Sequence, residues 1–274
     1  CIRDSYYQFQ TPKVTAAAGI FTRDMMHDDD YSTAFFSESE RFFHNRMNGV
    51  LAQYNGKRDS YVEFVCDWEG MYSTLSREKF RILLAGRHYL DTFYYGFNYS
   101  MFHYAGQQGA PIENVVDLQL LTPCVGVRFN AFFDFDIKLG ALLTAQRDRS
   151  FGHSWEKPCM GEFAFRISRW GLSLDERLYV GDNIHPFFYG HELEDGTPLP
   201  YGRELYPAES FFRTDQKVYS RTALSYRRSF FDDTVSVRAE FAAHHDGTAL
   251  GTQQMLVVGV KLLKTVYNSK NHKK

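Results

Sequence analysis

The sequence predicts an all-β fold, a single domain over residues 1–274 formed by a transmembrane antiparallel up-and-down β-barrel of about twelve strands. Apolar and polar side chains alternate along most of the chain, the connections alternate in length, and the composition is aromatic-rich although it is polar on average. A soluble β-sandwich also hides one apolar face, so the first observation fits both folds. A sandwich has no reason to sort its connections by length, and this favours the barrel.

The composition has the balance expected of a membrane barrel. Aromatic residues make up 17% of the chain, with 18 Tyr and 25 Phe, while the mean hydropathy is −0.40. Half of the strand residues of such a barrel face a polar interior, and aromatic rings form girdles at both interfaces. No apolar run approaches the roughly 18 residues that a spanning helix needs. A net charge of −2 without a basic face argues against a nucleic-acid partner.

The stretch Ser60–Arg87 shows the alternation most clearly and predicts a β-hairpin. In its first run, apolar positions alternate with positions that include acidic residues. In its second run, apolar positions alternate with positions that include basic residues. Folding the hairpin brings both charged sets onto one face, where cross-strand neighbours interact. The expected ion-pair lattice consists of Glu63, Asp67, Glu69, Arg81 and Arg87.

Twelve segments pass as strands, because apolar residues recur at every second position along most of them. They are Lys13–Arg23, Met47–Asn55, Ser60–Ser73, Lys79–Tyr89, Thr92–Ala105, Val115–Phe129, Asp136–Arg147, Cys159–Arg169, Gly171–Val180, Phe211–Arg227, Thr234–His245 and Met255–Thr265.

Short and long connections take turns between these strands. The short ones are Asn55–Ser60, Tyr89–Thr92, Arg169–Gly171 and Arg228–Asp233. The longer ones are Asp24–Arg46, Gly106–Asn114, Asp148–Pro158, Gly181–Ser210 and Asp246–Gln254. Outer-membrane barrels place short turns on the periplasmic side and longer loops outside. The chain is therefore expected in the cell outer membrane.

Three local features depart from regular strands. Pro123 cannot donate to a ladder, so a bulge or a strand end is expected in the sixth strand. Glu176 falls on the face of the ninth strand that should meet lipid. In the first long connection, Ser37 precedes acidic residues, which is typical of the start of a short helix.

The four cysteines, Cys1, Cys66, Cys124 and Cys159, are widely separated and form no CxxC pair. This spacing argues against a metal cluster and against a disulfide framework, and no cofactor is expected. Cys66 falls on the apolar face of its strand, where a cysteine acts as a small hydrophobe. Cys1 fits a lipidated N-terminus and equally an arbitrary start of the sequence.

Five stretches resemble a group of Bacteroidetes outer-membrane β-barrel proteins: Ala34–Ser39 (AFFSES), Gly49–Tyr54 (GVLAQY), Tyr61–Trp68 (YVEFVCDW), Leu120–Pro123 (LLTP) and His244–Gly247 (HHDG). The resemblance implies a Gram-negative outer membrane, a barrel, and further strands before residue 1. It implies no activity, because none is assigned to that group.

Charged side chains on the polar strand faces are expected to line the lumen. They carry both signs and are Glu63, Asp67, Glu69, Lys79, Arg81, Arg87, Lys138, Glu162, Arg166, Arg177, Lys217, Arg221, Arg227, Arg238 and Glu240. A lumen of mixed charge passes small polar solutes, or it cross-links itself with ion pairs and closes. A barrel of about twelve strands lies between filled and open barrels, so both outcomes stay open. The basic excess on the tenth and eleventh strands hints at anionic solutes.

The loop Gly181–Ser210 is rich in proline and supplies candidates for external binding. These are the aromatic residues Phe187, Phe188, Tyr189, Tyr201 and Tyr206. Aromatic rings on a stiff loop stack on sugars or hold a partner protein, or they form a local cluster that folds over the barrel mouth.

Three polar clusters are weaker candidates. His27–Asp30 and His191–Asp195 offer oxygen ligands for Ca²⁺, but their spacing matches no EF-hand, so solvated turns are the simpler interpretation. His244, His245 and Asp246 end the eleventh strand. An outer-membrane hydrolase acting on lipid would need a serine beside such a histidine, and no serine elbow accompanies them.

The sequence therefore favours a passive or accessory role over catalysis. The expected function is a porin-like narrow channel for small polar solutes, or an accessory scaffold subunit of a larger membrane protein complex. The expected partners are outer-membrane lipid and another outer-membrane protein. An outer-membrane hydrolase is the alternative.

Overall fold

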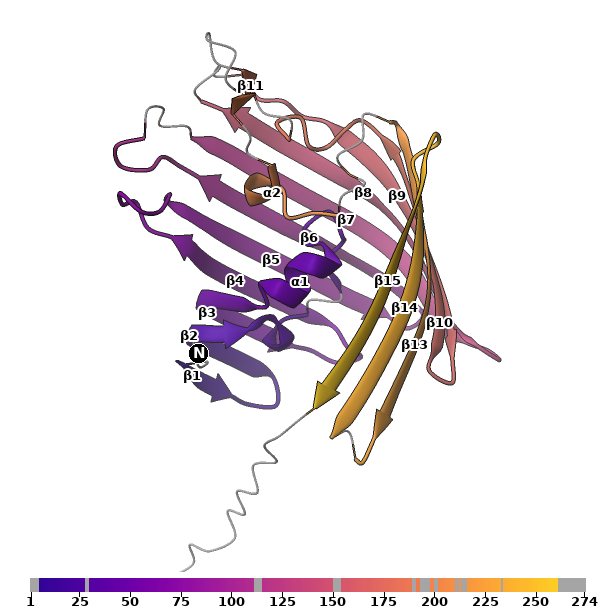
Figure 1. The fold of residues 1–274 in the computed structure, drawn as a ribbon. Helices are drawn as coiled ribbons and strands as arrows, with labels where there is room; N and C mark the ends of the chain where they lie inside the picture. Colours follow the sequence, from indigo (N-terminus) through magenta and orange to yellow (C-terminus); the bar gives the residue numbers. More distant parts are fainter. Residues whose placement is uncertain are drawn as a thin grey trace, which may run out of the picture.

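Thirteen strands of the computed structural model form one antiparallel sheet, in which each strand pairs with the next sheet strand along the chain (Figure 1). The structure describes residues 5–27, 30–110, 115–149, 154–188, 191–192, 198–199, 202–209, 212, 216–232 and 234–260. The sheet strands are β1 (Ser5–Gln10), β2 (Val14–Thr22), β3 (Arg46–Asn55), β4 (Tyr61–Gly70), β5 (Lys79–Leu90), β6 (Phe93–Tyr104), β7 (Val116–Asn130), β8 (Asp134–Asp148), β9 (Cys159–Arg169), β10 (Leu172–Gly181), β13 (Val218–Phe230), β14 (Val235–His245) and β15 (Leu250–Val260). The all-β prediction is confirmed.

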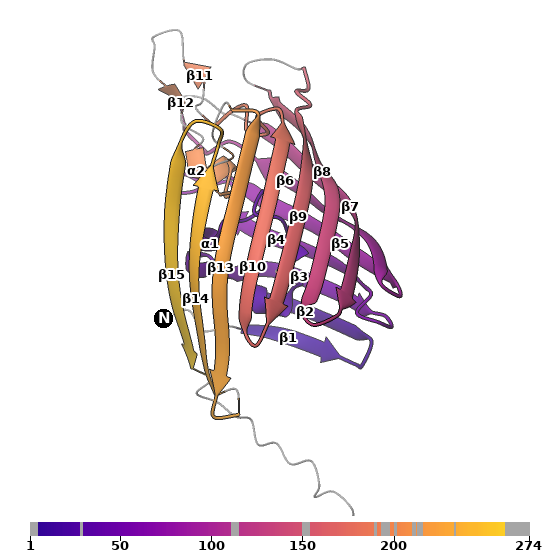
Figure 2. The ribbon, with the colours of Figure 1, turned by 90° about the vertical axis from the view of Figure 1, so that its right-hand side faces the viewer.

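The sheet curls into a deep trough but does not close into a barrel (Figures 1 and 2). β1 and β15 form its two edges, and no pairing joins them within the described residues. Two short helices, α1 (Glu38–Phe43) and α2 (Gly202–Leu205), lie on the concave side (Figure 1). A small hairpin, β11 (His191–Glu192) and β12 (Pro198–Leu199), stands apart from the sheet. No described helix is long and apolar enough to cross a membrane.

The connections alternate in length along the sheet. One end, called the short-turn end below, carries turns at 11–13, 56–60, 91–92, 131–133, 170–171 and 231–234. The opposite end, called the long-loop end, carries the connections 23–45, 71–78, 105–115, 149–158 and 182–217. The last connection differs from the prediction, because 246–249 is short. β15 begins at Leu250, which pairs with His245 of β14.

Backbone geometry explains the tightest turn. Trp170 and Gly171 join Arg169 to its partner Leu172, and both turn residues have positive φ, 53° and 83°. A two-residue connection of this kind has a twist that matches the twist of the flanking strands. Glycine is required at the second position, because an added Cβ would lie 2.3 Å from the carbonyl oxygen of Arg227.

The strand prediction missed β1 and misplaced the starts of two other strands. Ser5–Gln10 pairs along its whole length with β2, although its faces differ little in polarity. The tenth predicted strand begins at Val218 rather than Phe211, and the last begins at Leu250 rather than Met255. The sheet thus has thirteen strands where about twelve were expected.

The sheet accommodates both Pro123 and Glu176, the two residues expected to fit poorly in regular strands. Pro123 does not end β7, which continues to Asn130 in an unchanged register, but the ladder to β8 is interrupted at Thr122 and Pro123. A proline has no N–H to donate, so the interruption needs no bulge. Glu176 lies on the convex face, where Thr222 of the neighbouring β13 donates a hydrogen bond to its carboxylate.

The two faces of the sheet differ in chemistry. Large exposed apolar side chains lie on the convex face and include Val50, Tyr54, Val62, Phe64, Trp68, Leu90, Phe93, Tyr95, Phe97, Val125, Leu139, Leu143, Phe163, Leu172, Leu174, Val180, Val218, Leu224, Phe241, Leu256, Val258 and Val260. Charged side chains point to the concave side and are buried there, among them Glu63, Asp67, Arg81, Glu162 and Arg221. A soluble protein buries its large apolar side chains and exposes its charges, so this distribution is inverted.

The connection between β2 and β3, residues 23–45, folds back into the concave side, and we call it the inner segment. Its side chains Tyr31, Phe35 and Phe36 are at most 2% exposed and belong to the main core cluster. The segment leaves and rejoins the sheet at one place, because Arg23 N donates a 2.7 Å hydrogen bond to Asn45 O.

The helix expected in this connection is confirmed. α1 begins after Ser37, whose side-chain oxygen accepts a 3.0 Å hydrogen bond from the backbone N–H of Glu40. This hydroxyl satisfies one of the N–H groups that a helix leaves free at its start. α1 ends at Phe43 and has no fully buried residue, so polar contacts such as that between Glu38 and Arg238 connect it to the rest of the chain.

The connection 182–217 also enters the concave side. Phe187 and Tyr206 are buried in a second core cluster against β6 and β7. Ser37 N donates a 2.8 Å hydrogen bond to Pro207 O, which ties the two connections together. The inner segment and the connection 182–217 thus fill the interior of the trough.

Candidate functional site

Glu63 of β4 anchors the inner segment to the sheet. Its side chain is fully buried, and its carboxylate accepts hydrogen bonds from His27 N (2.9 Å), Tyr31 Oη (3.1 Å) and Gln53 Nε2 (2.6 Å). Two of these donors come from the inner segment and one comes from β3. A buried carboxylate requires such partners, because an uncompensated buried charge is costly. Glu63 thus holds the inner segment in place.

The β4–β5 hairpin forms only part of the expected ion-pair lattice. Arg81 pairs with Glu69, with Nε and Oε1 3.1 Å apart. Asp67 lies opposite Arg81 in the register, but its carboxylate accepts a 2.8 Å hydrogen bond from Asn48 N. The Arg81 guanidinium lies over the Phe102 ring, 4.3 Å from its centroid. The guanidinium of Arg81 is therefore shared between a carboxylate and an aromatic ring of the filled interior.

Arg87 also turns away from its own hairpin. Its guanidinium pairs with Asp30 of the inner segment at 2.9 Å and lies 4.9 Å from the centroid of the Tyr94 ring. His27 stacks on Tyr61 beside it, with ring centroids 3.7 Å apart. The inner segment therefore reaches from the long-loop end toward the short-turn end of the sheet.

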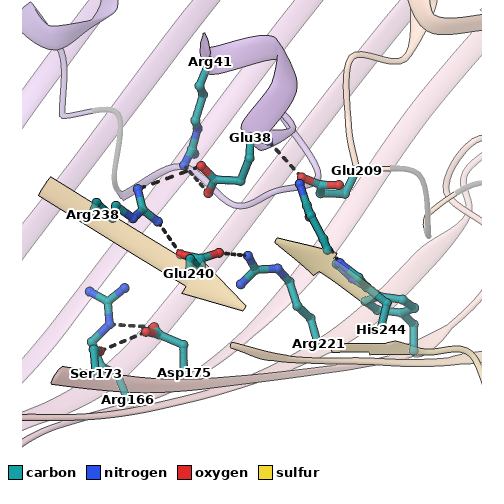
Figure 3. A network of polar contacts seen from close by, with 12 residues as sticks. Glu38, Arg41, Arg166, Ser173, Asp175, Glu209, Arg221, Arg238, Glu240 and His244 are labelled. Atoms are coloured by element: carbon teal, nitrogen blue, oxygen red, sulfur yellow. Dashed lines mark hydrogen bonds and ion pairs between the residues drawn. The ribbon is translucent and has the colours of Figure 1, made fainter. Parts of the chain in front are cut away.

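A second charge network joins α1 to β13 and β14 (Figure 3). Glu240 accepts hydrogen bonds from Arg221 (2.5 Å) and Arg238 (2.6 Å). Arg238 also reaches Glu38 of α1 at 4.0 Å, and Glu38 N donates a 2.8 Å hydrogen bond to Glu209. Both interior connections are thereby fastened to the last strands of the sheet.

A polar pocket with about 70 Å³ of free space opens on the concave face toward the short-turn end, and we call it the short-turn pocket. Strands β5 to β10 and the inner segment line it. The lining residues whose charged side chains lie on the concave side are Asp30, Arg87, Arg128, Asp136, Lys138, Arg166, Asp175 and Arg177. This space accommodates several water molecules.

Ion pairs cross the wall of this pocket from strand to strand. They are Arg128–Asp136 (2.8 Å), Lys138–Glu162 (3.0 Å) and Arg166–Asp175 (2.6 Å). The register places Arg128, Asp136, Arg166 and Asp175 in one row across β7, β8, β9 and β10, with alternating sign. Figure 3 shows the last of these pairs, in which Ser173 also donates to Asp175 at 3.0 Å. Opposite charges in such positions stabilise the sheet.

The structure places the lumen candidates that lie in strands on the concave side of the sheet, whereas Lys217 lies in the connection just before β13. Glu63, Asp67, Glu69, Arg81, Arg87, Lys138, Glu162, Arg166, Arg221, Arg238 and Glu240 each have the contacts given above. Arg87, Lys138 and Arg166 come together in the short-turn pocket. Glu63 and Asp67 hold backbone groups instead.

The sequence reasoning missed the other half of the pocket. Asp136 and Asp175 lie two positions from Lys138 and Arg177, and residues two positions apart in a strand point to the same face. The alternation was therefore enough to predict that both carboxylates face the lumen. No sequence pattern indicated that Asp30 lies in the pocket, because its place beside Arg87 depends on how the inner segment folds back.

Three of the five loop aromatics lie within the described residues, and these three pack inward rather than being displayed for external binding. Phe187 is 4% exposed and Tyr206 is 1% exposed, and Phe188 packs against the same cluster. The ring of His185 stacks on Tyr206 at 4.2 Å. These residues form a local cluster, which was the second alternative for this loop. Tyr189 and Tyr201 lie outside the described residues.

The weaker candidates gain no support. Asp28, Asp29 and most of the second acidic cluster (193–195) lie outside the described residues, as does Cys1. Within the described ranges, no group of three or more His, Cys, Asp and Glu side chains is placed to hold a metal ion. Both ring nitrogens of His244 are engaged, Nδ1 with the Tyr219 hydroxyl and Nε2 with Gln253 at 3.3 Å.

Comparison with known proteins identifies no relative: no family model, no curated protein and no solved structure matches the chain. The resemblance to Bacteroidetes outer-membrane barrels stays a prediction from the sequence.

Proposed function

We propose that the chain is an outer-membrane β-barrel with a filled lumen, which acts as an accessory scaffold subunit of a larger outer-membrane complex. The observation that carries this proposal is the apolar convex face, exposed on strands from β3 to β15. The largest apolar patch of a soluble monomer covers roughly 300–600 Å². A continuous apolar face across most of a sheet is instead typical of the lipid-facing surface of a membrane barrel.

Polar residues border this apolar face at one end, and aromatic residues border it at the other. At the long-loop end, Asp117 of the convex face pairs with Arg147 (2.6 Å) and Arg149 (2.9 Å). At the short-turn end, the exposed rings of Phe132 and Trp170 meet edge to face, with centroids 6.0 Å apart. Aromatic girdles flank the apolar band of membrane barrels, and short turns lie on the periplasmic side. We therefore assign the short-turn end to the periplasm.

The proposal requires that the edges of the sheet be paired in the membrane. β1 and β15 present unpaired N–H and C=O groups along their outer sides. Each such group costs several kcal/mol in hydrocarbon, so open edges do not persist there. Closing the seam between β1 and β15 turns the observed trough into the proposed barrel.

The filled interior favours a scaffold over an open channel. Tyr31 and Phe36 are fully buried within the trough, and ion pairs fasten the inner segment to its wall. The short-turn pocket and a second pocket beside Gln146 offer only about 70 and 20 Å³ of free space. Porins, by contrast, keep a wide aqueous lumen.

Purification and electrical recording test the two parts of this proposal. The protein should require detergent, and a soluble, monodisperse sample without detergent would contradict the membrane location. In planar bilayers the protein should be silent, whereas a stable single-channel conductance would establish the channel instead. Copurification from native membranes would then identify the partner of the scaffold.

The geometry around His244 does not favour the hydrolase alternative. A serine hydrolase needs one imidazole nitrogen for the serine hydroxyl and the other for an orienting group. Here Tyr219 and Gln253 occupy these positions. Release of fatty acid from lipid that disappears in a His244→Ala variant would reverse this ranking.

A further inference from the structure

We infer that a partner protein completes the barrel by inserting one strand between β1 and β15. The inference rests on the proposed function, and it names the contact through which the chain joins a larger complex. It starts from the direction of the two edge strands. Every pair of neighbours in the thirteen-stranded sheet is antiparallel, so the first and last strands run in the same direction.

Direct pairing of β1 with β15 would therefore be parallel. Parallel pairs are slightly less stable per residue, and bacterial single-chain outer-membrane barrels have an even number of antiparallel strands. A second copy of the chain does not help, because copies inserted in one membrane share one orientation, and every edge of one copy then runs parallel to every edge of the other. One strand from another source is antiparallel to both edges.

The two edge strands are open to such pairing. Soluble proteins protect their sheet edges with charged side chains, proline or bulges. Neither β1 (SYYQFQ) nor β15 (LGTQQMLVVGV) contains Asp, Glu, Lys, Arg or Pro. Strand addition to an exposed edge gains affinity from backbone hydrogen bonds and specificity from the alternate side chains.

The side chains of the two edges define the strand that fits between them. On the convex side the edges present large apolar side chains, such as Phe9 and Leu256, which are 61% and 70% exposed. On the concave side they present uncharged ones, such as Gln8 and Met255. The inserted strand therefore carries apolar side chains outward and uncharged side chains inward. Residues 261–274 (KLLKTVYNSKNHKK) do not show this pattern, because lysines recur throughout them.

The inner segment leaves an aromatic surface behind the opening. The segment begins and ends at β2 and β3, near β1, and Glu38 of α1 reaches Arg238 of β14, next to β15, at 4.0 Å. α1 thus spans the inner side of the opening, through which it is seen in Figure 1. Phe42 and Phe43 of α1 are 60% and 74% exposed. A strand in the opening would lie over this helix and reduce the exposure of both rings.

Cysteine cross-linking in native membranes measures the spacing of the two edges. Direct pairing would bring one concave pair within disulfide range, with Cα atoms about 4.4–6.8 Å apart. An inserted strand separates the edges by about 9–10 Å, which excludes a disulfide but allows a bismaleimide bridge. In a chain whose own cysteines are replaced by serine, Gln8→Cys is combined in turn with Gly251→Cys, Gln253→Cys, Met255→Cys, Val257→Cys and Gly259→Cys.

Two pairs within the sheet calibrate both outcomes. Gln8→Cys with Ala17→Cys joins register partners on adjacent strands and should form a disulfide. Gln8→Cys with Leu51→Cys spans one intervening strand and should accept only bismaleimide. The pairs between β1 and β15 should include one that behaves like the second control, and none that behaves like the first. A disulfide would overturn the inserted strand but leave the membrane barrel intact, whereas neither product in any pair would contradict both.

Photo-cross-linking in the same membranes identifies the source of the strand. A benzophenone amino acid in place of Phe9 or Leu256 should capture one and the same segment of another protein, with apolar and uncharged residues in alternation. Capture of a segment of this same polypeptide, or of different segments from the two edges, would overturn the inference.

A single backbone donor provides the matched control for this capture. Thr11 N bonds to Val14 O at the end of the β1–β2 ladder, and bonding positions alternate along a strand, so the N–H of Gln8 points to the free edge. Gln8→Pro removes this donor without removing a bond to β2 and should abolish the capture. Gln8→Thr keeps the donor and should retain it. Undiminished capture in Gln8→Pro would contradict strand addition.

Discussion

At the scale of the residue, adjacent positions of one strand meet opposite surroundings. On β4, Glu63 is fully buried and satisfied by three donors, whereas Phe64 beside it is 37% exposed on the convex face. The period of two along a strand separates these environments, so a charge is required at one position and harmful at the next.

Phe64→Arg tests the lipid-facing assignment of the convex face. We expect it to destabilise the protein in lipid by about 2–4 kcal/mol if Phe64 lies near the bilayer midplane, because the guanidinium would contact hydrocarbon. Refolding into bilayers and heat-modifiable gel mobility report the loss. A harmless substitution in lipid would remove the main support for the barrel.

Glu63→Ala tests the anchoring of the inner segment. The change leaves the donors His27 N–H, Tyr31 O–H and Gln53 without their acceptor. Each buried group left unsatisfied costs about 1–3 kcal/mol, so unfolding in denaturant should shift strongly. Glu156→Ala, at an exposed side chain in a long-loop connection, is the control. Equal stability of the two variants would show that Glu63 does not hold the segment.

The sequence predicted the face of each charged residue but not its partner. Alternation placed Asp67 and Arg87 on the charged face correctly, because the pleat allows no other arrangement. Their partners are Asn48 N and Asp30, one a backbone group and the other in the inner segment. A period of two carries no information about a loop that folds back.

At the scale of the element, connection length and the short helix were the most predictable features. The alternation of lengths and the helix after Ser37 follow from local sequence. β1 was missed, because the strand is only six residues long and each of its faces combines a tyrosine with at least one polar side chain, which leaves little contrast to detect. Pairing with β2 on one side holds this strand, which is a tertiary effect.

Gly171→Ala tests the turn between β9 and β10. Gly171 and Gly109 both have positive φ, 83° and 78°, so alanine is strained at either position. At Gly171 the new methyl group would also meet the Arg227 carbonyl at 2.3 Å, whereas nothing lies within 4 Å at Gly109. We expect Gly171→Ala to cost about 1–3 kcal/mol more than Gly109→Ala in denaturant unfolding. Equal costs would contradict the close approach.

At the scale of the whole molecule, the inner segment decides whether a closed sheet could conduct. It is attached to the sheet by a narrow base, since Arg23 N and Asn45 O are 2.7 Å apart. A short Gly-Ser linker therefore suffices to replace residues 24–44 without pulling β2 and β3 apart. The replacement removes Tyr31 and Phe36 from the interior and releases Arg87 from Asp30.

We expect this replacement to convert a silent protein into a conducting one in planar bilayers. Removing the buried rings would open space along β4 to β6, and the charged groups left behind favour water over a dry interior. The same linker in place of the exposed connection 71–78 is the control and should leave the protein silent. Heat-modifiable mobility must first show that both variants fold. If the variant without residues 24–44 folds but stays silent, the connection 182–217 must block the lumen instead. Its residues Ile184, Leu205 and Tyr206 are also fully buried on the concave side.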